Sequence, residues 1–196
     1  MLHSSFTPPS DSESLPCLKR RRFLRNSLIM AGALVSAPVV ATTSKTGGGE
    51  KRIEFHNLHT NEREKILYWS SGEFQQGGLS DLNNILRDHR TGDVYDMDAG
   101  LIDFLYDLDL QLGGKKRFEV ISGYRSPKTN SALRNNSSGV AKRSLHMQGK
   151  AIDIRVPGVA LKDLRHTALT MKRGGVGFYP KSNFIHVDTG RVRSWG

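Results

Sequence analysis

The stretch SLHMQGKAIDIRV, residues 144–156, decides the fold around the part of the chain that carries its chemistry. In residues 151–156 polar and apolar side chains alternate, which is typical of a β-strand with one face on the core. Asp153 then lies on one face of the strand, and Ile152 and Ile154 lie on the other. We therefore expect the isoleucines to be buried and the carboxylate to stand on the open face of a sheet.

A second alternating segment, FIHVD at residues 184–188, follows near the C-terminus. His186 and Asp188 share one face of this predicted strand, opposite Ile185 and Val187. Both strands thus show a polar face above an apolar one, as a site on the open face of a sheet requires.

The remaining hydrophobic pattern predicts a hairpin, two further strands and four helices. They are the hairpin 52–58 with 65–69, the strands 118–122 and 176–179, and the helices 79–87, 98–112, 127–134 and 161–171. Asp98 and Ser126 are the expected N-caps of the second and third helices, and Ser80 or Asp81 that of the first. The predicted class is α+β, an antiparallel sheet with flanking helices.

Two histidines and one aspartate on these segments are candidate metal ligands. Zinc is bound by neutral imidazole and by carboxylate, and a catalytic zinc site takes three protein ligands and leaves a fourth position for water. His146, Asp153 and His186 supply that set. A single His or Asp is more often an exposed or hydrogen-bonded residue than a ligand, so the spacing alone leaves both interpretations open.

The motifs resemble those of the zinc D-Ala-D-Ala peptidases, which share a fold with the hedgehog signalling domain. The pattern S-x-H-x-x-G-x-A-x-D is matched over residues 144–153, H-x-D over 186–188, and S-x-Y-R-S over 122–126. The resemblance extends from about Ile53 to Trp195 and is strongest to a branch of periplasmic murein endopeptidases. It implies a hedgehog/DD-peptidase-like fold with Zn²⁺ held by His146, Asp153 and His186.

The same resemblance gives Arg125 a catalytic and substrate-binding role, in which its guanidinium holds a substrate carboxylate or the developing oxyanion. A structural ion pair is the alternative for Arg125. A carboxylate must also take a proton from water, but several relatives carry an acid where this chain has Asn183. Asp188 is the nearest replacement as the catalytic base, and an acceptor that orients a ligand histidine is its alternative role.

Two further residues are candidates for substrate binding. Tyr124 could stack on sugar or peptide, although most aromatic side chains belong to the core. His59, near the first hairpin, could edge a substrate groove, or it could be a structural histidine with satisfied hydrogen bonds.

The N-terminus has the layout of an export signal. A basic cluster at 19–25 (KRRRFLR) precedes an apolar run at 27–40 that is shorter than the ~18–20 residues needed to span a bilayer. We predict an export signal of the twin-arginine type at 1–41, a flexible linker at 42–51 and a zinc peptidase domain at 52–196. No stable membrane span is expected unless the signal stays uncleaved. Cleavage would remove Cys17, the single cysteine, which excludes disulfides and thiolate chemistry in the mature protein.

The formal net charge of +10 favours acidic partners. Export argues against nucleic acid and favours the anionic bacterial cell wall. The sequence therefore predicts an exported, periplasmic and monomeric zinc-dependent peptidoglycan hydrolase, a murein endopeptidase that cuts peptide cross-links. A peptidoglycan carboxypeptidase and a non-catalytic peptidoglycan-binding domain of the same fold are the alternatives.

Overall fold

The computed structural model describes residues 49–137 and 139–196. The predicted export signal and most of the predicted linker lie outside the described residues, and Lys51 already belongs to the first strand. No helix in the described ranges is long and apolar enough to cross a membrane.

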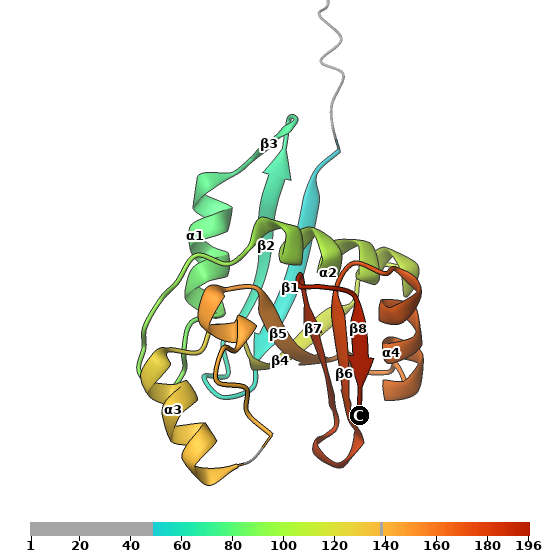
Figure 1. The fold of residues 1–196 in the computed structure, drawn as a ribbon. Helices are drawn as coiled ribbons and strands as arrows, with labels where there is room; N and C mark the ends of the chain where they lie inside the picture. The colour runs from blue at the N-terminus through green and yellow to red at the C-terminus, as the bar shows by residue number, and fades with distance from the viewer. Residues whose placement is uncertain (1–48, 138) are drawn as a thin grey trace, which may run out of the picture. The chain divides into compact units, whose positions relative to one another are not determined.

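The described part of the chain folds around one eight-stranded sheet with the order β3-β2-β1-β4-β5-β7-β6-β8 (Figure 1). The strands are β1 Lys51–Asn57, β2 Arg63–Ser70, β3 Glu73–Phe74, β4 Arg117–Ser122, β5 Ala151–Arg155, β6 Gly175–Tyr179, β7 Phe184–Asp188 and β8 Arg193–Trp195. The sheet is mostly antiparallel, as predicted, but β1 pairs with β4 and β6 pairs with β8 in parallel. The hairpin and the four other predicted strands are present, whereas the short strands β3 and β8 were not predicted.

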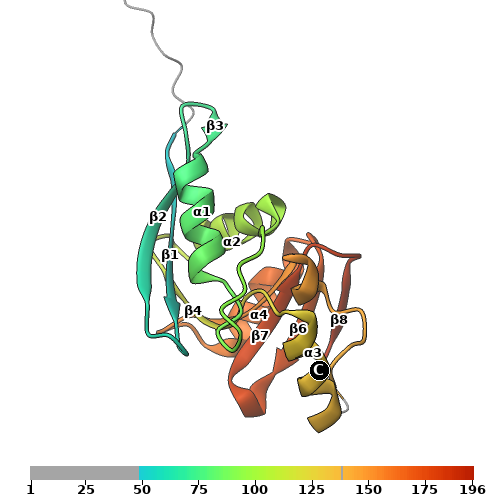
Figure 2. The same cartoon turned by 90° about the vertical axis from the view of Figure 1, so that its left-hand side faces the viewer.

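The four predicted helices are all present. They are α1 Gln76–Ile85, α2 Ala99–Gln111, α3 Pro127–Asn136 and α4 Leu161–Thr170. Two short 3₁₀ turns are also present, η1 Leu145–Gln148 before β5 and η2 Pro180–Ser182 between β6 and β7. Helices α1 and α2 lie on the same side of β1 and β2 (Figure 2). Asp98 and Ser126 cap their helices, because each side chain accepts a hydrogen bond from the backbone N–H three residues further on.

The predicted start of the first helix was wrong. Helix α1 begins at Gln76, and its N-cap, Gln75, makes no capping hydrogen bond through its side chain, so neither Ser80 nor Asp81 is the cap. The first turn lies against β2, where a Cβ on Gly78 would collide with the carbonyl oxygen of Leu67. Close packing on the strand therefore sets the position of this helix, and packing of that kind leaves no capping signal in the sequence.

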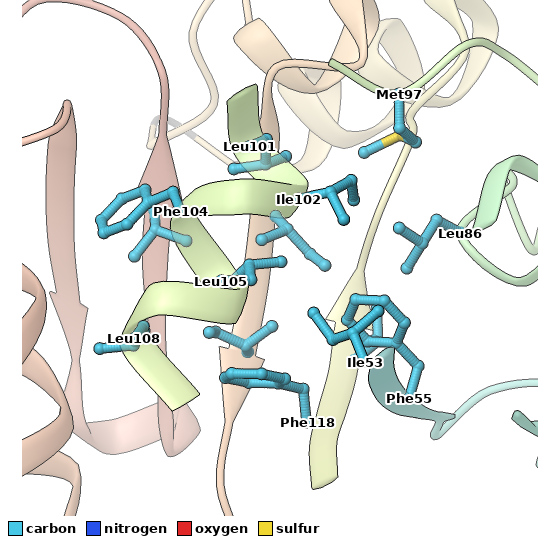
Figure 3. Close-up of a cluster of buried hydrophobic side chains, with 14 of the residues drawn as sticks. Ile53, Phe55, Leu86, Met97, Leu101, Ile102, Phe104, Leu105, Leu108 and Phe118 are labelled. Carbon is cyan, nitrogen blue, oxygen red and sulfur yellow. The ribbon is translucent and has the colours of Figure 1, made fainter. Parts of the chain in front are cut away.

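The core lies between α2 and the sheet. Figure 3 shows Leu101, Leu105 and Leu108 of α2 in one cluster with Phe55 and Phe118, and all five side chains are fully buried. The apolar residues of β5 and β7 belong to the same core, which confirms the predicted burial of the face opposite Asp153 and His186. They are Ile152, Ile154, Ile185 and Val187.

Candidate metal centre

Strand pairing brings two of the three candidate ligands together. Strands β5 and β7 run antiparallel in a register that sets Asp153 directly opposite His186 and Ala151 opposite Asp188. Side chains of directly opposed residues stand on the same face, about 4.5–5.5 Å apart at Cβ. This register, together with the alternation in each strand, places the carboxylate beside the imidazole.

The third candidate, His146, comes from η1, which precedes β5. Gly149 ends this turn in the left-handed conformation, with φ of 65°. A Cβ there would collide with the carbonyl oxygen of Asp96, so both the backbone angle and the space require glycine. On the other side, the backbone N–H of Arg125 donates to the carbonyl oxygen of His146. These contacts hold the histidine turn over the end of β5.

The ligand atoms of the three residues form a compact, buried triangle. The Nε2 atom of His146 lies 3.2 Å from Nδ1 of His186 and 3.3 Å from Oδ1 of Asp153, and those last two atoms are 2.9 Å apart. For a tetrahedral ion bound at about 2.0–2.1 Å, neighbouring ligand atoms lie about 3.3–3.4 Å apart. The observed spacing matches what a zinc ion needs to within a few tenths of an ångström.

The hydrogen bonds of the two imidazoles determine where their lone pairs point. A carbonyl oxygen only accepts, so His146 donates Nδ1–H to Gly123 at 2.8 Å and keeps a lone pair on Nε2. His186 lies 2.9 Å from Asp188 through Nε2 and 2.9 Å from Asp153 through Nδ1, so the tautomer with its proton on Nε2 presents the Nδ1 lone pair to the cluster. Two nitrogen lone pairs and a carboxylate oxygen thus converge on one point, and the donor set fits a divalent cation.

The charges of the cluster agree with this fit. Burial alone would lower the pKa of His186, but hydrogen bonds to Asp153 and Asp188 raise it above its ordinary value. Burial alone would raise the pKa of Asp153, but the neighbouring imidazoles hold it below the usual range. The two carboxylates thus favour positive charge at His186, and the imidazoles favour the ionised form of Asp153.

Asp188 stands on the same face but is completely buried. Its Oδ1 accepts hydrogen bonds from the backbone N–H groups of Gly175 and Gly190 and from Arg193, and its Oδ2 accepts from Arg193 and His186. These donors outweigh burial and hold the pKa of Asp188 below its ordinary value. Of the two roles that the sequence left open, this geometry fits the acceptor that orients His186.

Arg125 lies at the edge of the metal centre. One guanidinium nitrogen is 3.3 Å from the hydroxyl of Ser122 and 3.4 Å from Oδ2 of Asp153, both long for hydrogen bonds. Its Nε atom is buried and has no hydrogen-bond partner among the described residues. Burial lowers the pKa of Arg125, and Asp153 only partly offsets this. The guanidinium is thus held near the cluster with donors still available.

A cleft of about 420 Å³ opens above the cluster. Besides the three candidate ligands and Arg125, its wall includes Arg143, Ser144, Tyr179, Phe184, Arg193 and Trp195. Of the three predicted substrate-binding residues, Arg125 belongs to this wall, whereas Tyr124 and His59 lie outside it. Tyr124 stacks on Tyr95 with ring centroids 4.8 Å apart, and His59 stacks on His89 at 3.8 Å.

The sequence did not predict that Arg193 and Trp195 contribute to the site. Arg193 is the ion-pair partner of Asp188, with a guanidinium nitrogen 2.7 Å from Oδ2. A signal was present in β6, where Gly175 and Gly177 leave room on the site face for Arg193 and Trp195. Alternating glycines in a strand indicate close approach by another part of the chain.

A buried cluster of two histidines and one aspartate below an open cleft is typical of metal-dependent hydrolases. Residues 45–195 match the peptidase family model described as "Peptidoglycan L,D-endopeptidase MepK", and the chain belongs to this family.

Curated relatives agree with the family match. "Peptidoglycan L,D-endopeptidase MepK" of Escherichia coli (strain K12) is 40% identical over 177 residues, covering 90% of this chain and 96% of the relative. The Shigella flexneri protein of the same name gives the same values. "Probable peptidoglycan L,D-endopeptidase MepK" of Haemophilus influenzae is 44% identical over 144 residues, covering 73% of this chain and 77% of the relative. No solved structure shows a significant match to the chain.

Proposed function

We propose that the protein is a zinc-dependent peptidoglycan endopeptidase that cuts peptide cross-links of the cell wall, with the metal held by His146, Asp153 and His186. The observation that carries this proposal is the convergence of two imidazole lone pairs and one carboxylate oxygen, 2.9–3.3 Å apart, below an open cleft. Family membership supports the substrate class, because the matching model describes a peptidoglycan endopeptidase.

Each side chain has a separate task in this mechanism. When bound, zinc supplies Lewis acidity, which polarises a peptide carbonyl and makes water a stronger nucleophile at neutral pH. Asp188 holds the ring of His186 in the tautomer that leaves Nδ1 free for the metal. Arg125 offers guanidinium N–H groups to a substrate carboxylate or to the carbonyl oxygen as it gains negative charge.

The bond that is cut is proposed to be the L,D type, as the printed names of the relatives indicate. We further propose that residues 1–41 direct export to the periplasm and that 42–51 link the signal to a peptidase domain at 52–196. The basic cluster followed by a short apolar run supports this division. It also fits the substrate, which lies outside the cytoplasm.

The test is digestion of purified sacculi by the wild-type protein, by His146→Ala and by His166→Ala, an exposed histidine on α4 that serves as the matched control. We expect the wild type and His166→Ala to release the same fragments. His146→Ala and chelator-treated wild type should release none, and added zinc should restore the treated wild type.

Defined muropeptides then identify the bond. Dimers joined through two diaminopimelate residues should be cut, and dimers joined through D-alanine should remain intact. Trimming of monomers alone would indicate a carboxypeptidase, and binding to sacculi without release of fragments would indicate a non-catalytic binding domain. Identical products from wild type and His146→Ala would refute the metallopeptidase proposal.

A further inference from the structure

Strand β6 presents glycine instead of a side chain beside the metal centre. Gly177 is paired with His186 across the β6–β7 ladder, so it lies on the face that carries the candidate ligands. A Cβ on Gly177 would lie 2.6 Å from the indole ring of Trp195, which occupies the space above it. The indole also lies next to His186, with ring centroids 5.3 Å apart. The missing side chain therefore makes room for Trp195 at the site.

Trp195 makes a hydrogen bond that fixes the orientation of a second side chain. Its Nε1 lies 2.9 Å from the hydroxyl oxygen of Tyr179. An indole N–H can only donate, so the tyrosine oxygen is the acceptor and its own proton points elsewhere. Among the described residues this hydroxyl has no other hydrogen-bond partner. The ring of Tyr179 is held by stacking on Phe184, with centroids 4.6 Å apart.

Tyr179, whose hydroxyl proton is free, lines the cleft together with Arg125. In the described wall of the cleft Asp153 is the only carboxylate, and it is a candidate ligand. Arg125 and Tyr179 can therefore donate hydrogen bonds to negative charge that develops on a substrate in this cleft. A donor already in place for that charge lowers the barrier, because it needs no reorganisation during the reaction.

We propose that Tyr179 is a catalytic residue that donates its hydroxyl hydrogen bond to the carbonyl oxygen of the peptide being cut, and that Trp195 is the residue that positions it. The proposal rests on the proposed function and adds a second donor beside Arg125. The tyrosine keeps its proton throughout, so no bond is made or broken at its oxygen. Removal of one such donor lowers kcat on the order of 10²-fold.

The experiment measures kcat and KM on a defined cross-linked dimer for Tyr179→Phe, Trp195→Phe and the double variant. Tyr106→Phe and Trp69→Phe, which change the same residue types away from the cleft, are the controls. Tyr179→Phe should lose about 10²-fold in kcat with little change in KM, zinc content or melting temperature. Trp195→Phe should show a smaller loss of kcat, and the double variant should have the same kcat as Tyr179→Phe alone.

Three results would overturn the inference. One is Tyr179→Phe turning over at the wild-type rate while His146→Ala is inactive. Another is a loss that lies in KM or zinc content instead of kcat. The third is full additivity of the two substitutions, because it would show that Trp195 acts independently of the tyrosine. A wild-type protein that cuts no cross-link is a separate outcome, which refutes the proposed function itself and with it any catalytic role for Tyr179.

Discussion

Replacement of Arg193 by alanine should weaken the metal centre without touching any of the three proposed ligands. Arg193 holds Asp188 through two hydrogen bonds, of 3.0 Å to Oδ1 and 2.7 Å to Oδ2. Asp188 in turn accepts from Nε2 of His186, which leaves Nδ1 free for the metal. Without the arginine, the carboxylate loses its counter-charge and the imidazole loses a rigid partner.

The size of the effect follows from burial. Loss of one partner from a fully buried ion pair costs about 3–5 kcal/mol of folding free energy. The Asp188 side chain is 0% exposed, but that of Arg193 is 31% exposed, so solvent already screens the pair. Asp188 also keeps three other donors, from His186, Gly175 and Gly190. We therefore expect a loss of about 2 kcal/mol, or a fall in melting temperature of roughly 4–8 °C.

The affinity of Arg193→Ala for zinc should fall by about 10–100-fold, as is usual when the group that orients a ligand histidine is disturbed. Zinc titration calorimetry and thermal unfolding measure the two effects separately. Arg191→Ala is the matched control, because Arg191 is exposed and its side chain makes no hydrogen bond to another described residue. If Arg193→Ala bound zinc as tightly as Arg191→Ala, the argument that Asp188 orients His186 would be refuted.

Three more outcomes are expected. Although burial alone would raise it, hydrogen bonds from Thr129 and Ser126 hold the pKa of Asp88 below its ordinary value. The stability that Asp88 contributes is thus present above its unfolded pKa of about 3.9 and is lost as pH falls through its folded pKa. Urea titrations of Asp88→Asn between pH 6 and pH 3 should therefore show a smaller loss of unfolding free energy than the wild type. Gly149→Ala should lower the free energy of unfolding, measured with denaturant, by on the order of 3 kcal/mol, because φ is positive there and the new Cβ would collide with a backbone carbonyl. The control Gly77→Ala, at an exposed helical position with open space around it, should leave the stability unchanged or slightly higher. Chelation should lower the melting temperature, and zinc at 100 times its Kd should add about 2.7 kcal/mol to the free energy of unfolding. An unchanged melting curve would contradict a contribution of the metal to stability.

Much of the site follows from alternation in two short segments. The i, i+2 pattern places Asp153 on the open face of β5 and His186 on that of β7, and the buried isoleucines between them fix which face is which. Alternation alone does not bring the two strands together. The observed pairing of Asp153 with His186 is a matter of register, and register is set by the packing of the whole sheet.

The last strand, β8, could not be predicted from the sequence because it is only three residues long. A period of two cannot be recognised over such a length. The contacts of Arg193 with Asp188 and of Trp195 with Tyr179 depend on the parallel pairing of β8 with β6, which is a long-range feature. The signal that did exist, the alternation of Gly175 and Gly177, indicates close approach without naming the residue that approaches.

Aromatic residues near the motif were harder to assign from sequence than the charged ones. Tyr124 adjoins Arg125 in the chain, but its ring turns to stack on Tyr95, in the segment between α1 and α2. His59 finds its stacking partner, His89, in the same segment. Stacking of this kind depends on how a loop folds over a strand end, and residues in such a loop carry no periodic pattern.

The same-face argument predicted that Asp188 is near His186, and this is correct, but nearness does not determine a chemical role. A base needs a lone pair that faces the water, whereas both oxygens of Asp188 are occupied by donors. Asn183 adds nothing as a base, and its φ of 54° is a left-handed conformation that asparagine tolerates better than most residues. The local backbone thus gives a structural reason for the amide at that position.

The two glycines of β6 connect these observations. Gly175 gives space to the Arg193–Asp188 pair that orients a proposed ligand, and Gly177 gives space to the indole that orients Tyr179. One short strand, β8, thus supports both the metal and the proposed donor, although it contributes no ligand itself. A chain that ended before Arg193 would keep His146, Asp153 and His186, yet it would lose both supports at once. Metal affinity and turnover should therefore fall together on truncation, whereas Tyr179→Phe should reduce turnover alone.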